Sequence, residues 1–214
     1  MELKFSECTL VSLEKLFGLE AFDECQALQD WLAAKVAISE WEHTGLEYFR
    51  QLLRHNAHSW NESELIQNFI GPIFALVNFS GKHCNYFAER ELRGVVGEVT
   101  MYGNPDGMIA SGFREPETPY FCLQEYKKHL DPKGDPAGQA LAAMLVAQEL
   151  NEHRLPVYGC YVVGEMWWFM LLQERAYCLS AAYSATGEDG VFEIFRILKA
   201  LKGFVMPLTE QGNA

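Results

Sequence analysis

The order of apolar and polar positions predicts a helical first quarter of the chain. Leucine and aromatic residues recur at three- and four-residue steps between residues 7 and 56, which is the period of an amphipathic helix. No proline interrupts this stretch, and Gly18 and Gly45 are the expected breaks. We therefore predict two or three short helices, which form a helical N-terminal extension of residues 1–60.

The rest of the chain alternates between helical and strand-like patterns. Asn61 and Glu64 fit a helix-capping box ahead of an apolar helical face, in which Pro72 predicts a kink. Asp135-Pro136 is a suitable start for a second helix. The expected strands cover residues 86–100, 105–111, 119–127, 157–164 and 166–172, and a last amphipathic helix covers residues 190–203.

This order of elements predicts one α/β domain of residues 61–214, with a mixed central sheet flanked by helices. The strands on either side of Gly164-Glu165 are expected to form a hairpin. The longest apolar runs, LAAMLVA and MWWFMLL, are too short to span a bilayer, and the N-terminus lacks the apolar core of a signal peptide. Six widely spaced cysteines without a C-x-x-C pair indicate reduced thiols. We expect a cytoplasmic protein with no membrane partner.

The charge distribution restricts where a nucleic acid would bind. The chain has 29 acidic and 17 basic residues and a formal net charge of -12, which argues against binding nucleic acid by bulk electrostatics. Residues 1–62 carry eleven acids and five bases, whereas residues 82–133 carry eight acids and seven bases. The middle of the chain is therefore close to neutral, and it also contains the residues with candidate chemistry.

Two acids and a lysine lie near the ends of two neighbouring predicted strands. Asp106 follows a proline, and eighteen residues separate it from Glu125, which is followed by Tyr126 and Lys127. Alternate residues of a strand face the same side, so Glu125 and Lys127 point one way and Tyr126 points the other. Carboxylates that converge in this way suit Mg²⁺ or Mn²⁺. A lysine beside a metal-bound water can orient that water or lower its pKa.

These residues resemble the PD-(D/E)XK nuclease superfamily, which has the restriction-endonuclease-like fold. The resemblance covers roughly residues 61–173, and residues 121–151 also look like uncharacterised bacterial members of the superfamily. It consists of the Pro-Asp at Asp106, the Glu-x-Lys at Glu125, an acid on the preceding helix and a glutamine on the following helix. It implies a restriction-endonuclease-like core.

The resemblance also implies a metal centre. Asp106 and Glu125 would ligate the Mg²⁺ or Mn²⁺ ion, and the backbone carbonyl of Tyr126 would be a third ligand. Glu64, on the preceding helix, would hold a water molecule or a second metal ion. The protein would then be a metal-dependent nuclease that hydrolyses phosphodiester bonds of nucleic acid, with DNA as the expected substrate.

Other residues would act on the substrate. The resemblance implies that Lys127 positions or deprotonates the attacking water, and that Gln139 orients the active site or contacts the substrate backbone. Lys128, His129 and Lys133 form, together with Lys127, the densest basic patch of the chain, which would guide a phosphate backbone. Cutting both strands needs two sites, which is compatible with a homodimer. The alternative function is a non-cleaving nuclease-fold protein, which binds nucleic acid or binds a protein partner through the acidic N-terminal helices.

Each of these residues also has a purely structural interpretation. Asp106 before a glycine is typical of a turn, and Glu125 with Lys127 would suit the exposed face of an edge strand. Glu64 would act only as a helix cap, and Gln139 would only solvate the first turn of its helix. Four coincidences in the family's order favour the functional interpretation. Weaker candidates are the pair His55 and His58, the thiol of Cys84, and base stacking by Trp167, Trp168 and Phe169.

Overall fold

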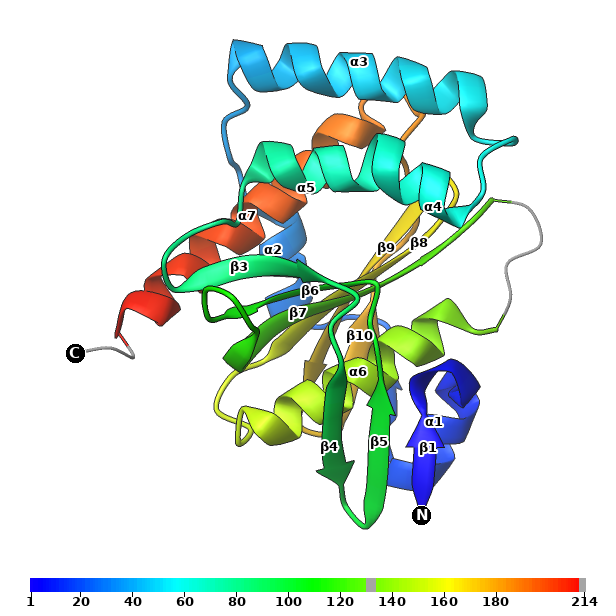
Figure 1. The fold of residues 1–214 in the computed structure, drawn as a ribbon, viewed down its shortest axis with the longest axis vertical. Helices are drawn as coiled ribbons and strands as arrows, with labels where there is room; N and C mark the ends of the chain where they lie inside the picture. Colours follow the sequence, from blue (N-terminus) through cyan, green and yellow to red (C-terminus); the bar gives the residue numbers. More distant parts are fainter. Residues whose placement is uncertain (130–133, 212–214) are drawn as a thin grey trace.

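Alternating apolar residues in the middle of the chain build a mixed sheet flanked by helices, as predicted (Figure 1). This computed structural model describes residues 1–129 and 134–211. The larger sheet contains β2 (Glu20–Phe22), β3 (Cys84–Ala88), β6 (Gly107–Ser111), β7 (Glu117–Lys127), β8 (Val157–Val163), β9 (Met166–Gln173), β10 (Ala176–Leu179) and β11 (Tyr183–Ser184). Its spatial order is β2–β10–β9–β8–β7–β6–β3, and β11 pairs with β9. β7 is parallel to β8 and β10 is parallel to β2, whereas the other pairs are antiparallel.

A second, three-stranded sheet corrects one of the predicted strands. It has the order β1–β5–β4, with β1 (Glu2–Lys4), β4 (Leu92–Val96) and β5 (Val99–Gly103). The expected single strand of residues 86–100 is therefore wrong, because it divides between the two sheets at Glu89, where φ is +51°. A tight turn at Gly97, with φ of +58°, then joins β4 to β5. The alternation of side chains is the same in both sheets, so the pattern alone does not reveal the division.

Helix α6 (Pro136–Leu150) lies between the two sheets. It contacts β7 and β8 of the larger sheet and β4 and β5 of the smaller one. Every residue from Ala137 to Gln148 is buried, because a helix that is covered on both sides has no solvent-facing stripe. The helix begins where the sequence predicts: the Asp135 carboxylate accepts hydrogen bonds from the N–H groups of Gly138 (3.0 Å) and Leu10 (2.9 Å).

Helices cover the opposite face of the larger sheet (Figure 1). They are α2 (Gln26–Ala33), α3 (Glu40–Asn56), α4 (Glu62–Leu65), α5 (Gly71–Val77) and α7 (Gly190–Gln211). A π-helical turn, Ile66–Ile70, joins α4 to α5 directly ahead of Pro72, where the sequence predicts a kink. Helix α7 extends eight residues beyond the predicted end at residue 203, because its apolar face continues through the buried Val205. No helix in the described part of the chain is long and apolar enough to cross a membrane.

The first sixty residues are not the purely helical extension that the sequence predicts. They supply β1 to the smaller sheet and β2 to the larger one, and helix α1 (Leu10–Phe17) packs against α6. Gly18 ends α1 with φ of +63°, as expected. Gly45 instead lies inside α3, where a Cβ atom would be 3.4 Å from Leu76, so the glycine allows α3 to approach α5 closely. Strands of three residues are too short to show a period, and their pairing partners are distant in sequence.

A partly buried ion pair between Glu42 and Lys199 joins α3 to α7. Lys199 Nζ donates to both carboxylate oxygens at 2.7 and 2.8 Å, and the N–H of Ser39 donates to one of them at 2.7 Å. Burial alone would raise the pKa of Glu42, but the hydrogen bonds from Lys199 and Ser39 lower it overall. The ionised form therefore stabilises the fold above the pKa of an unfolded glutamate, and this stabilisation is lost as the pH falls through the folded pKa.

We expect Glu42→Gln to lower the free energy of unfolding by about 1–2 kcal/mol at pH 7. The difference from the wild type should be smaller at about pH 3, below the ordinary pKa of glutamate, because the unfolded wild-type glutamate is then protonated and folding must first remove that proton. Urea denaturation at both pH values measures this. Glu40→Gln, an exposed change in the same first turn, is the control, and a difference that is equal at both pH values would contradict the ion-pair explanation.

Candidate functional site

The predicted site begins where β7 loses one of its neighbours. β6 starts at Gly107, opposite Gln124, so beyond Gln124 the β6 side of β7 has no strand partner in the larger sheet. Asp106, directly before β6, fills this gap: the N–H of Tyr126 donates to Asp106 Oδ2 at 2.6 Å. The carboxylate thus accepts a hydrogen bond that a carbonyl of a neighbouring strand would otherwise accept. It lies beside the end of β7, as the sequence predicts.

Glu125 and Lys127 share one face of β7, as predicted from their spacing. Lys127 Nζ donates to Glu125 Oε1 at 2.6 Å and to the backbone carbonyl of Tyr126 at 3.0 Å. The side chains of Glu125 and Lys127 are only 10% and 12% exposed. The alternative of a solvent-exposed face is therefore wrong, because both side chains are largely buried.

The environment of this site disfavours the ionised form of both carboxylates. Burial raises the pKa of Asp106, and hydrogen bonding to the Tyr126 N–H only partly counters it. Burial, followed by repulsion from Asp106, likewise raises the pKa of Glu125, although Lys127 opposes this. For Lys127, burial lowers the pKa, but the attraction of Glu125 and Asp106 raises it overall. One lysine thus faces the buried Glu125 and the partly buried Asp106, an arrangement that an additional cation would stabilise.

The acid that approaches Lys127 from the preceding helix is Glu62, not the predicted Glu64. Glu62 Oε2 lies 3.7 Å from Lys127 Nζ. Glu64 instead accepts the N–H of Asn61 at 2.8 Å and donates its own N–H to Asn61 Oδ1 at 2.9 Å, so it forms the capping box. Residues two apart on a helix point about 200° apart, so a capping Glu64 leaves Glu62 on a different side. The capping pattern in the sequence therefore indicated the role of Glu64, but not which acid lies beside Lys127.

Gln139 and Glu125 line the same cavity, which has a volume of about 350 Å³. Gln139 is 7% exposed in the first turn of α6, so it does not merely solvate the helix end. Lys4, at the end of β1, and Tyr102, on β5, form other parts of the wall. Sequence reasoning missed Lys4, because only the pairing of β1 with β5 brings the N-terminus to this place.

The structure places the other predicted residues unevenly. Lys128 and His129 follow Lys127 directly and are half-buried, whereas Lys133 lies outside the described residues. The ring of His129 contacts that of His58, with centroids 4.5 Å apart, so His58 pairs with His129 rather than with His55. Among the weaker candidates, burial raises the pKa of the Cys84 thiol to about 11. The side chains of Trp167 and Phe169 are fully buried, and the ring of Trp168 stacks on that of Tyr161 with centroids 4.8 Å apart.

Gly107 lets buried polar groups approach the backbone beside Asp106. A Cβ atom at Gly107 would lie 2.6 Å from both Tyr86 Oη and Gln124 Oε1. The Tyr126 hydroxyl donates to the same Gln124 oxygen, so these groups have little freedom to move. We expect Gly107→Ala to lower the free energy of unfolding by about 1–3 kcal/mol, the usual cost of overpacking.

Urea denaturation of Gly107→Ala beside Gly203→Ala tests this expectation. Gly203 is exposed within α7, and a Cβ atom there would have no neighbour within 4 Å. Gly203→Ala should therefore raise the free energy of unfolding by about 0.5–1 kcal/mol, since alanine has the higher helix propensity. Equal effects of the two substitutions would contradict the steric explanation.

The oxygen atoms of this site have the chemistry that Mg²⁺ and Mn²⁺ prefer. The donors are the carboxylates of Asp106 and Glu125 and the carbonyl of Tyr126. Within residues 1–129 and 134–211, no group of three or more His, Cys, Asp or Glu side chains is arranged to hold a metal ion. A metal ion here would therefore depend on two carboxylates, one backbone oxygen and several water molecules, which is a coordination that Mg²⁺ commonly accepts.

Comparison with known proteins adds no relative from which a function could be transferred. No protein-family model matches the chain, and a search of curated proteins finds no match. The function is therefore argued from the residues of the site. They provide the partly buried Asp106, the buried Glu125 with a lysine bonded to it, and a cavity lined by Glu125 and by the buried Gln139.

Proposed function

We propose that this protein is a divalent-metal-dependent nuclease with a restriction-endonuclease-like core, which hydrolyses phosphodiester bonds of DNA. One observation supports the proposal most directly: Asp106 binds the backbone of the same short segment in which Lys127 bonds to Glu125. Asp106, directly before β6, and Glu125 and Lys127, on β7, are thus arranged in the way that the PD-(D/E)XK resemblance implies. Gln139, on the wall of the adjoining cavity, adds the fourth residue of that resemblance.

Each residue would have a separate role. Asp106, Glu125 and the Tyr126 carbonyl would hold Mg²⁺ or Mn²⁺, which when bound supplies a Lewis acid and an activated water. The Lys127 ammonium, fixed between Glu125 and the Tyr126 carbonyl, would orient the attacking water and offset negative charge on the phosphate. Glu62 would take the role that the resemblance implies for Glu64, because Glu62 is the helical acid whose carboxylate lies 3.7 Å from Lys127 Nζ.

The net charge of -12 limits how the substrate would be held. Lys4 and Gln139 on the cavity wall, together with Lys128 and His129 beside β7, provide few contacts for phosphate groups. We therefore expect weak binding that is sensitive to salt, because phosphate recognition depends on released counterions. A homodimer would supply the second site that cutting of both strands needs.

The direct test is cleavage of circular, linear and single-stranded DNA and of RNA, each with Mg²⁺, with Mn²⁺ and with EDTA. We expect metal-dependent cleavage of DNA, which EDTA abolishes and added metal restores. Titration of the metal into the protein by calorimetry should show binding without substrate. Cleavage that continues in EDTA would contradict the proposal, and so would the absence of both cleavage and metal binding.

One observation favours the alternative of a non-cleaving protein. The ion pair of Lys127 with Glu125 already neutralises one acid, and the described residues contain no three-acid metal group. Such a protein would bind nucleic acid, or bind a protein partner through its acidic N-terminal segment, without metal-dependent cleavage. Binding of DNA that is measurable by fluorescence anisotropy, unchanged by EDTA and accompanied by no products, would identify this alternative.

A further inference from the structure

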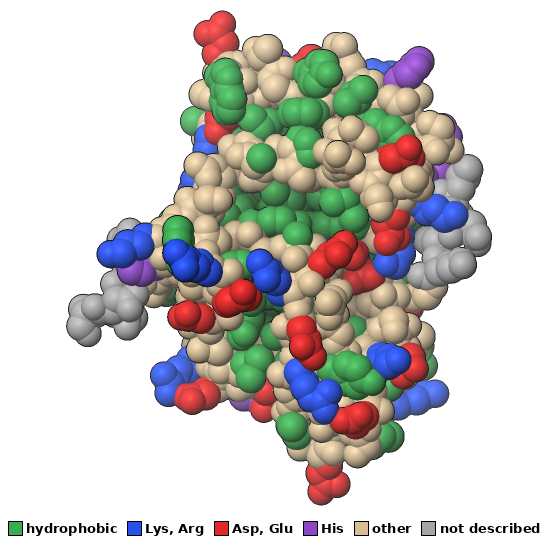
Figure 2. Space-filling model, in the orientation of Figure 1, with side chains coloured by type: hydrophobic (Ala, Val, Ile, Leu, Met, Phe, Trp, Pro, Cys, Tyr) green, Lys and Arg blue, Asp and Glu red, His purple; other side chains and the backbone are tan. Residues whose placement is uncertain are grey.

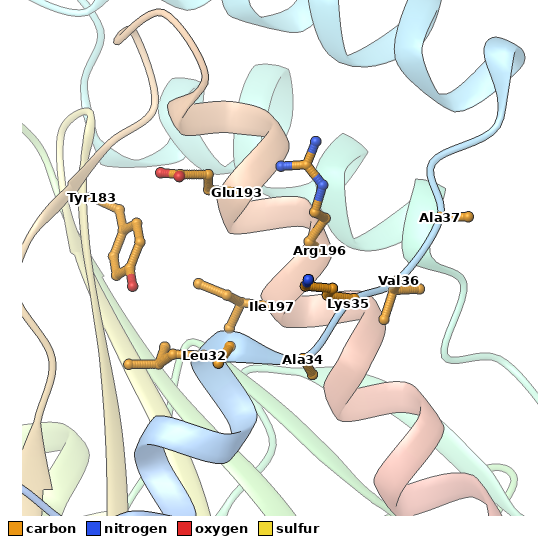
Figure 3. A pocket seen from close by; sticks show the side chains of 10 residues that line it. Leu32, Ala34, Lys35, Val36, Ala37, Tyr183, Glu193, Arg196 and Ile197 are labelled. Atoms are coloured by element: carbon orange, nitrogen blue, oxygen red, sulfur yellow. The ribbon is translucent and has the colours of Figure 1, made fainter.

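A second cavity, of about 540 Å³, lies between the loop that follows α2, strand β11 and helix α7 (Figure 3). Leu32 and Ile197 provide apolar surface from α2 and α7, and Val36 adds to it from the loop. None of the residues that line it belongs to the candidate nuclease site. Its volume is typical of pockets that bind small molecules.

Hydrogen bonds fix the walls of this cavity. The indole N–H of Trp31, on α2, donates to the Ile197 carbonyl of α7 at 2.8 Å. At the other end of the loop, Lys199 Nζ donates to the Ala37 carbonyl at 2.9 Å, and Glu42 holds that lysine in turn. The loop is therefore attached to α7 through both of its ends. This attachment lowers the conformational entropy that the loop loses when a ligand binds.

The cavity presents positive charge without a protein partner. Lys35, on the loop, and Arg196, on α7, are exposed, and no ion pair within the described ranges includes either of them. Both line the cavity (Figure 3). Glu193 is the one acid among the residues that line the cavity, so these side chains carry a net charge of +1 in a chain of net charge -12. Burial, followed by the charge of Glu193, raises the pKa of Tyr183, whose hydroxyl therefore stays protonated and able to donate.

We propose that this cavity binds a small organic anion, with its acidic group between Lys35 and Arg196 and its apolar body against Leu32 and Ile197. The Tyr183 hydroxyl supplies a further donor from the β11 wall. A carboxylate and a phosphate monoester both meet this description, because each offers oxygen acceptors to two cations.

The test uses three probes that share one apolar body: 2-naphthoate, 2-naphthyl phosphate and the neutral 2-naphthylmethanol. Isothermal titration calorimetry on the full chain should show one saturable site for an anionic probe and about tenfold weaker binding of the neutral one. Lys35→Gln and Arg196→Gln should each weaken anion binding about three- to tenfold. Lys15→Gln, which removes an exposed charge on α1 outside the cavity, is the matched control.

The outcomes are distinct. The proposal is supported if the carboxylate or the phosphate binds more strongly than the neutral probe, and if Lys35→Gln and Arg196→Gln weaken this binding while Lys15→Gln does not. The anion that binds more strongly then identifies the acidic group. Equal affinity for the neutral and the anionic probes would overturn the proposal, since apolar contacts alone would then account for binding. Equal weakening by Lys15→Gln would also overturn it, and so would the absence of binding by both anionic probes.

Discussion

Replacing Glu125 with glutamine is expected to reduce DNA cleavage by about three orders of magnitude. The substitution keeps the size of the side chain but removes one of the two carboxylates of the site and the charge that holds Lys127. It would also weaken metal binding, which calorimetry measures without substrate. Rates of plasmid cleavage with Mg²⁺ and Mn²⁺ for the wild type and Glu125→Gln give the comparison, and Glu98→Gln, in an exposed turn, is the control.

A second pair of substitutions tests the assignment of the helical acid. Glu62→Gln should slow cleavage, because Glu62 lies 3.7 Å from Lys127 Nζ. Glu64→Gln should leave cleavage nearly unchanged, since glutamine also completes a capping box. The reverse result would restore Glu64 to the site. Cleavage that persists in Glu125→Gln at the wild-type rate would place the activity elsewhere or in a contaminating enzyme.

The second large effect is expected from Trp31→Ala, which should lower the free energy of unfolding by about 3–5 kcal/mol. Trp31 is 1% exposed, and its ring meets those of Tyr158 and Phe169 at centroid distances of 4.9 and 5.3 Å. Its N–H also donates to the Ile197 carbonyl, which the substitution leaves without that donor. The midpoint of thermal unfolding should fall by roughly 10 °C.

Trp41→Ala is a matched control from the same N-terminal region. Trp41 is 71% exposed on α3, so its removal should change the free energy of unfolding by less than about 0.5 kcal/mol. Urea and thermal denaturation followed by circular dichroism compare the two variants. Similar small effects of both would mean that the first sixty residues contribute little to the core, contrary to the packing of Trp31.

Much of the fold followed from local pattern. The start of α6 at Asp135 and the β8–β9 hairpin at Gly164 were predicted, because caps and tight turns are encoded by adjacent residues. The division of residues 86–100 between two sheets was not predicted, since both strands alternate alike. Strand β10, which pairs with β2, was also missed, because its four residues gain their stability from distant partners.

The candidate site divides in the same way. The spacing of Glu125 and Lys127 predicted their common face, and the Lys127–Glu125 bond follows from it. The choice between Glu62 and Glu64 depends on the direction in which one helical turn meets β7, which spacing along the chain does not specify. Lys4 reaches the cavity of Glu125 only through the pairing of β1 with β5.

By itself, therefore, the sequence determined the mixed α/β class, the helix caps and the order of the acids and the lysine. It also determined that the excess of acidic charge lies outside the middle of the chain. Figure 2 shows the acidic and basic side chains on one face of the molecule. The tertiary structure alone decided that β1 and β2 join two different sheets and which helical acid meets Lys127. It also decided that Lys35 and Arg196 line the same cavity. The physical reason is range: caps, turns and strand faces depend on neighbours in the chain, whereas sheet pairing and charge clusters depend on residues that only folding brings together.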